Sequence, residues 1–180
     1  PYDGGYSWYA FPPNQARGVL EARGRLFALL EELKRAGWRT QDIYFYGFSQ
    51  GCLVSCDVGL HYPEPLGGVI GVSGYVYFFS RWRQKLSGAA PRTRWLLTHG
   101  WRDDALPIAE TRRHVRKLCD AGVPVEWVEF DKDHDFDYEI EIPLIREWVR
   151  RTFADDPSEL RYLPGNQRRS ARAPDRAVRP

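Results

Sequence analysis

Short apolar segments alternate with helical segments along this chain, and that alternation restricts the folds open to it. The segments with the composition of buried strands are residues 43–48, 68–73, 94–98 and 123–130. Apolar residues at three- and four-residue steps predict helices over residues 18–33, 52–60, 109–121 and 143–153. Strands joined by helices form right-handed crossovers in a parallel sheet. The predicted fold class is therefore α/β, a doubly wound, mainly parallel sheet with helices on both faces.

The cysteine content and the hydropathy pattern exclude several protein classes. Three cysteines, Cys52, Cys56 and Cys119, cannot all pair, and no Cys or His cluster has the spacing of a zinc site. We therefore expect neither a disulfide framework nor a metal site. No apolar stretch reaches the ~20 residues that span a bilayer, and no leader pattern opens the sequence. The sequence predicts a cytoplasmic protein without a membrane span.

The basic charge of the chain is concentrated at its C-terminal end. Residues 161–180 hold six of the 26 Lys and Arg side chains and one of the 24 Asp and Glu side chains. The other residues therefore carry 20 basic and 23 acidic side chains, a net charge of −3. Residues 155–180 contain hardly an apolar pair, which predicts a disordered basic tail. Because the body of the protein is not basic, we expect no nucleic-acid partner.

The residues Gly47-Phe48-Ser49-Gln50-Gly51 match the pattern G-x-S-x-G at the junction of a predicted strand and a predicted helix. In that setting the pattern forms a tight turn that presents a serine hydroxyl above the sheet. Gly47 and Gly51 are expected to let neighbouring backbone approach without a clash at Cβ. The N–H of Gln50, at the positive end of the following helix, is expected to bind an oxyanion. The alternative interpretation is an ordinary turn in which Ser49 is only an N-cap.

A serine nucleophile needs a histidine base, and the chain offers four histidines. His134 is the candidate, because it follows the last predicted strand in a loop from which it can reach back over the sheet. The alternative is a solvated loop histidine among acidic residues. His61 is interpreted as a surface or helix-end residue, and His99 ends a strand. His114 is placed among arginines on a solvated helix face.

Two aspartates are candidates for the acid that orients the histidine. Asp103 and Asp104 follow the third predicted strand in a loop that closes at Pro107. Either carboxylate can lie over the end of that strand, although Asp104 can also be only the N-cap of the next helix. Serine, acid and histidine candidates thus follow three different strands, in the order typical of α/β-hydrolases. We expect them at one edge of the sheet.

These motifs resemble the phospholipase/carboxylesterase family of α/β-hydrolases, which includes acyl-protein thioesterases. Residues 47–51 resemble the G-F-S-Q-G elbow of that family, and residues 99–107 resemble its H-G-x-x-D-x-x-x-P acid loop. The second motif favours Asp103 over Asp104. His134 stands where the family has its histidine, although a small residue commonly precedes it there and Asp133 does so here. The resemblance extends over residues 6–150.

The resemblance implies a serine hydrolase that cleaves carboxylic esters or thioesters through an acyl-enzyme. Ser49 would be the nucleophile, His134 the base and Asp103 the orienting acid. Neither a metal ion nor a cofactor is needed, and the expected partner is a small ester or thioester substrate. Phe48 and Trp8, the latter in a segment that resembles the S-W-Y/F segment of the family, are candidate substrate walls. A homodimer is one of the states that the sequence allows.

Two features indicate that the hydrolase domain, residues 1–154, is N-terminally incomplete. The chain contains no Met, and it opens after the point where the family has an H-G-x-G loop that supplies a second oxyanion N–H. Loss of one such donor typically lowers turnover by about 10²- to 10³-fold. The alternative function is therefore a catalytically impaired, hydrolase-like binding module.

Overall fold

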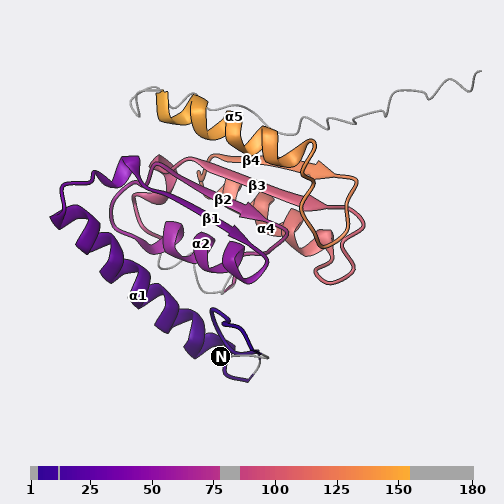
Figure 1. Cartoon of the computed structure of the whole chain (residues 1–180), viewed down its shortest axis with the longest axis horizontal. Coiled ribbons are helices and arrows are strands. Elements are labelled where there is room, and N and C mark those ends of the chain that lie inside the picture. Colours follow the sequence, from indigo (N-terminus) through magenta and orange to yellow (C-terminus); the bar gives the residue numbers. More distant parts are fainter. Residues whose placement is uncertain (1–3, 12, 78–85, 155–180) are drawn as a thin grey trace, which may run out of the picture.

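A computed structural model of the protein describes residues 4–11, 13–77 and 86–154 (Figure 1). The predicted basic tail, residues 155–180, lies outside the described residues, as do residues 78–85. In the part of the chain that is described, no helix is both long and apolar enough to cross a membrane.

The sheet has four parallel strands, which are neighbours in chain order. They are β1 (Tyr44–Phe48), β2 (Gly68–Val72), β3 (Trp95–Gly100) and β4 (Val125–Phe130). The four predicted strands are confirmed, with ends that differ by one or two residues. The largest difference is in β3, which continues through His99 to Gly100 and pairs there with Phe130.

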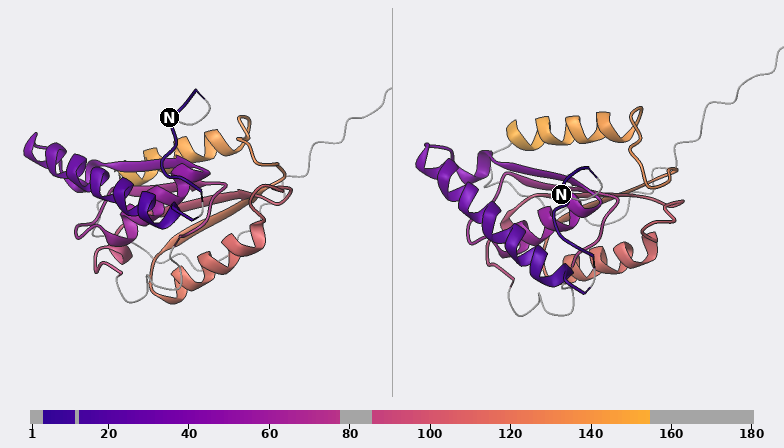
Figure 2. Two further views of the ribbon diagram at one scale, coloured as in Figure 1. Left: turned by 90° about the horizontal axis from the view of Figure 1, so that it is seen from below. Right: turned by 60° about the horizontal axis from the view of Figure 1, so that its bottom comes forward.

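Helices cover both faces of this sheet, as predicted for the fold class. The long helices are α1 (Gln15–Arg35), α2 (Gln50–His61), α4 (Ile108–Asp120) and α5 (Glu141–Ala154), and short 3-10 helices span Thr40–Asp42 and Ala90–Arg92. Figures 1 and 2 show α2 and α4 on one face, with α1 beside α2, and α5 on the other face. Each of the three connections between consecutive strands joins two strands that are parallel neighbours in the sheet.

Two apolar cores lie on opposite faces of the sheet because side chains alternate along each strand. Val69, Trp95 and Leu97 face α2 and α4 and belong to the larger core. Their strand neighbours Ile70 and Leu96 pack under α5 in the smaller one, together with Trp148 of that helix. Both faces of the central strands are therefore buried, as the apolar composition of these segments predicted.

His114 is buried, and the prediction that it lies on a solvated face of its helix was wrong. Its exposed fraction is 2%, and it shares the buried face of α4 with Thr111, Val115 and Leu118. The spacings of three and four residues put these side chains on one stripe, whereas Arg113 falls on the exposed side. Burial, followed by the charges of nearby basic side chains, lowers the pKa of His114 to about 4. It is therefore neutral at physiological pH.

A buried ion pair fastens α1 to α2. Arg23 donates from Nε and Nη2 to Asp57 at 2.6 and 2.8 Å, and Asp57 is 2% exposed. Replacing Arg23 with Met leaves this carboxylate without its main partner in a buried site, so we expect a loss of about 3 kcal/mol in the free energy of unfolding, measured in urea. Arg17→Met, which removes an exposed pair with Glu21, should cost less than about 0.5 kcal/mol. Equal costs for the two variants would contradict this prediction.

Candidate active site

Ser49 occupies a strained turn between β1 and α2. Its backbone has φ 52° and ψ −114°, in a region that residues with a side chain seldom adopt. Two hydrogen bonds hold this conformation: the Ser49 N–H donates to the Val72 carbonyl at 2.9 Å, and the Ser49 carbonyl accepts from the Leu53 N–H at 3.2 Å. The Ser49 side chain makes no capping bond to α2. The hydroxyl is therefore left for other partners.

Only one of the two glycines in the motif is required by close packing. A Cβ on Gly47 would lie 2.2 Å from the backbone C and O of Gly51, which is a severe clash. A Cβ on Gly51 would meet nothing closer than Trp8 Nε1 at 3.6 Å, an ordinary contact. The expectation that both glycines admit neighbouring backbone is thus confirmed for Gly47 and wrong for Gly51. The first turn of α2 packs against the end of β1, and Gly47 is the residue of β1 that this helical turn contacts.

His134 contacts both Ser49 and Asp103 from the loop between β4 and α5. Its Nε2 lies 3.0 Å from Ser49 Oγ, and its Nδ1 lies 2.8 Å from Asp103 Oδ2. Because a carboxylate only accepts, Nδ1–H donates to Asp103, which leaves Nε2 as the acceptor for the Ser49 hydroxyl. The Phe48 ring packs against the imidazole, with centroids 4.9 Å apart. Asp133, next to His134, is exposed and pairs with Arg102 at 3.1 Å.

Asp103 is the aspartate that the structure brings to His134. It is buried, whereas Asp104 is exposed. Asp103 Oδ1 accepts the Leu106 N–H at 2.7 Å, and Oδ2 lies 3.2 Å from His99 Nε2 in addition to His134. Burial lowers the pKa of His99, so this second ring is neutral, and its Nε2–H donates to the Leu106 carbonyl. Two donors, the Leu106 N–H and the His134 Nδ1–H, thus bind the Asp103 carboxylate and fix its orientation.

The contact of His99 with the Asp103 loop was not predicted from the sequence, where His99 was interpreted as the end of a strand and as the first residue of the motif at residues 99–107. His99 is completely buried in β3, and its Nε2 also lies 2.8 Å from the Leu106 carbonyl. The sequence signal that could have identified it is the spacing of four residues to Asp103, across a loop that turns back over the strand end.

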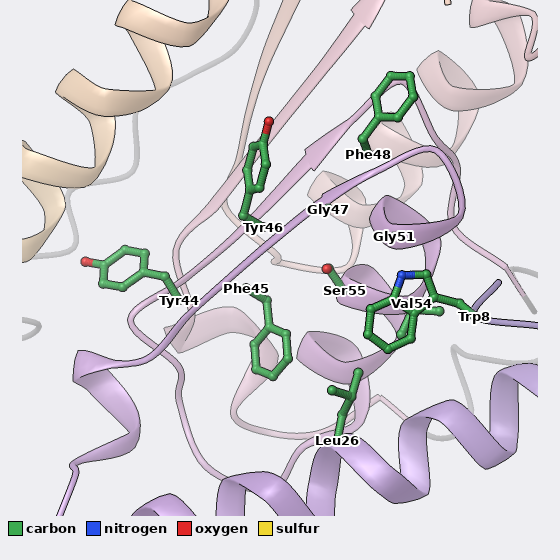
Figure 3. A pocket seen from close by; sticks show the side chains of 10 residues that line it. All are labelled: Trp8, Leu26, Tyr44, Phe45, Tyr46, Gly47, Phe48, Gly51, Val54 and Ser55. Carbon is green, nitrogen blue, oxygen red and sulfur yellow. The ribbon is translucent and has the colours of Figure 1, made fainter. Parts of the chain in front are cut away.

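The other predicted site residues lie around the turn at Ser49 but do not form a single wall. Gln50 is the first residue of α2, and its side-chain Oε1 accepts the Trp8 N–H at 3.3 Å. A pocket of about 360 Å³ runs along the outer edge of β1, and both Trp8 and Phe48 line it. Figure 3 shows Phe48 at one end of this pocket, Trp8 beside Gly51 and Val54, and Phe45 and Leu26 farther from Phe48. The structure thus places these two candidate substrate walls apart.

Within residues 4–11, 13–77 and 86–154, no three His, Cys, Asp or Glu side chains are arranged to hold a metal ion. The three cysteines, which lie in these ranges, are free thiols. A hydrogen bond with Cys52, followed by burial, raises the pKa of the Cys56 thiol well above its usual value, so Cys56 is protonated at neutral pH.

Sequence comparison decides the family. The sequence model of the phospholipase/carboxylesterase family matches residues 6–147, which is most of the chain. The protein belongs to this family. This phospholipase/carboxylesterase chain is 34% identical over 102 residues to acyl-protein thioesterase 1 of Schizosaccharomyces pombe, a match that covers 57% of this chain and 46% of that protein.

Two further relatives bear on the fold and on activity. The crystal structure of Arabidopsis thaliana SOBER1 superimposes with a TM-score of 0.76 at 26% identity, over 82% of this chain and 74% of that one. A rice protein (Oryza sativa subsp. japonica) named probable inactive carboxylesterase is 29% identical over 134 residues, 74% of this chain and 54% of that protein. The chain thus spans about half the length of the curated relatives it matches.

Proposed function

We propose that this member of the phospholipase/carboxylesterase family is a serine hydrolase that cleaves small carboxylic esters or thioesters. The observation that carries the proposal is the continuous hydrogen-bonded chain from Ser49 Oγ through the His134 ring to Asp103 Oδ2, with spacings of 3.0 and 2.8 Å. A serine with its base within reach, and a base oriented by a third group, is the arrangement of an activated nucleophile. The names of the thioesterase and carboxylesterase relatives agree with an acyl substrate.

In the proposed reaction, Ser49 Oγ attacks the acyl carbonyl while His134 Nε2 takes the hydroxyl proton. The resulting imidazolium is stabilised by the Asp103 carboxylate, which stays ionised. His134 then gives the proton to the departing alcohol or thiol as the bond to the acyl group breaks. Water, deprotonated by His134, attacks the acyl-Ser49 ester and releases the acid, which returns Ser49 to its starting state.

The Gln50 N–H is the proposed oxyanion donor. As the first residue of α2, Gln50 has no intrahelical acceptor for its N–H. It therefore lies at the positive end of a 12-residue helix, directly after the nucleophile. A developing oxyanion at this position gains both a hydrogen bond and the field of the helix.

Covalent labelling with a fluorophosphonate tests the proposal without assuming a substrate. Ser49 Oγ would displace fluoride from phosphorus, and the intact mass would rise by one phosphonyl group per chain. Ser49→Ala should remove the labelling entirely, whereas Ser7→Ala, at an exposed serine, should label like the unaltered protein. A folded chain that fails to label would reject the proposal.

The second candidate function is a non-catalytic, hydrolase-like binding module. It is favoured by the name of the rice relative, a probable inactive carboxylesterase. The two candidates separate in one respect: the binding module would keep the fold but would show no reaction of Ser49 with the probe.

A further inference from the structure

The loop that carries His134 is fastened from inside by a buried ion pair. Lys132 is 6% exposed and Glu141 is completely buried. Lys132 Nζ donates to Glu141 Oε2 at 2.7 Å, and Glu141 is the first residue of α5. The pair therefore closes the loop across the residues that include His134.

Both members of the pair make further hydrogen bonds to the backbone that follows His134. Lys132 Nζ also donates to the Asp135 carbonyl at 2.7 Å, and Glu141 Oε2 accepts the Asp137 N–H at 3.2 Å. Glu141 Oε1 accepts the Thr98 hydroxyl of β3 at 2.6 Å. One buried carboxylate thus joins the His134 loop and the start of α5 to the central sheet.

The backbone of Lys132 is held from the opposite side as well. Its carbonyl accepts the Arg102 N–H at 3.2 Å, and it approaches Gly100 so closely that a Cβ there would lie 2.1 Å away. Arg102 is the residue before Asp103. The loop that carries the histidine and the loop that carries the aspartate are therefore joined by a backbone bond beside the contact between the two side chains.

A buried ion pair holds a loop only at a large cost in desolvation free energy. Two desolvated charges typically stabilise a fold no better than well-packed apolar side chains of similar volume, but they fix geometry through directional bonds. Here those bonds surround His134, whose Nε2 must stay within about 3 Å of Ser49 Oγ for proton transfer. The Lys132 ammonium and the Glu141 carboxylate do not contact Ser49 or a reacting atom.

We propose that Lys132 and Glu141 are positioning residues that hold His134 between Ser49 and Asp103. The proposal rests on the proposed function for its kinetic consequence, but its structural consequence, the His134–Asp103 contact, can be measured independently. When the pair is broken, the loop can move away from the sheet, and a displacement of 1 Å at a reacting group lowers rates by about 100-fold.

The test compares Lys132→Met, Glu141→Leu and the double variant by the rate of fluorophosphonate labelling per folded chain. We expect each single variant to label about 100-fold more slowly. The double variant removes both charges, so it should regain stability in urea while labelling stays slow. Lys132→Arg, which keeps a cation, should recover part of the rate. A double variant that regains both stability and the original labelling rate would overturn the proposal.

Two controls separate positioning from lost stability and from failure of the proposed function. Arg23→Met breaks another ion pair with a buried carboxylate, between α1 and α2, and should label at the unaltered rate per folded chain.

The downfield proton NMR signal of His134 Nδ1–H, assigned with a His134→Gln variant, reports the contact with Asp103 without any reaction. We expect this signal to be lost in Lys132→Met. An unchanged signal in that variant would refute the positioning role even if Ser49 of the unaltered chain did not label.

Discussion

Asp103→Asn is expected to lower kcat for hydrolysis of p-nitrophenyl acetate by about 10⁴-fold with little change in KM. The Asp103 carboxylate accepts from the Leu106 N–H through Oδ1 and from His134 Nδ1–H through Oδ2, with His99 Nε2 also beside Oδ2. An asparagine that keeps the bond to Leu106 turns its NH₂ group toward the two imidazoles. The His134 proton must then move to Nε2, where the ring can no longer accept the proton of Ser49.

The neighbouring aspartate provides the matched control for this variant. Asp104 is exposed, and Asp104→Asn changes the same charge one residue away. We expect its kcat to stay within about threefold of the unaltered protein, because exposed charges interact weakly with their surroundings. If Asp103→Asn retained more than a tenth of the original kcat, or if both variants lost activity equally, Asp103 would not be the orienting acid.

Gly47→Ala is expected to destabilise the fold by about 4 kcal/mol or more. The added methyl group would lie 2.2 Å from the backbone C and O of Gly51 and 2.6 Å from Cys52 N. Because these atoms belong to the first turn of α2, no side-chain rotation can make room. Either β1 and α2 separate, or the turn at Ser49 opens. Urea unfolding followed by circular dichroism measures the loss.

Gly51→Ala tests whether the cost at Gly47 comes from packing or from the motif as such. At this position a Cβ meets only Trp8 Nε1, at 3.6 Å, and alanine is favoured over glycine inside a helix by about 1 kcal/mol. We therefore expect equal or slightly greater stability. Similar losses for the two variants would show that the packing explanation is wrong.

The sequence was sufficient to predict the parallel sheet and the juxtaposition of the three principal site residues. The buried strands are short and almost wholly apolar, and Ser49, Asp103 and His134 each follow the end of a different strand. Parallel strands bring their carboxyl ends to one edge, so position along the chain determines position in space. The choice of Asp103 over Asp104, in contrast, depended on the resemblance to the family and not on this geometry.

Residues whose environment depends on tertiary contacts were not predictable in the same way. His114 was misplaced because three nearby arginines dominate the local composition, although the helical stripe that it shares with Val115 and Leu118 is buried. In the sequence, Lys132 and Glu141 lie in or beside an acidic loop, and such charged side chains are usually solvated. Only the packing of α5 over β3 makes them a buried pair, because it brings Thr98 to Glu141.

The conformation of Ser49 also bears on how this chain has been selected. A residue at φ 52° and ψ −114° carries a backbone cost of roughly 1–3 kcal/mol, which glycine would avoid. Selection for thermal robustness alone would therefore favour glycine at position 49. Under the proposed function, a serine at position 49 keeps a nucleophilic hydroxyl at the expense of stability.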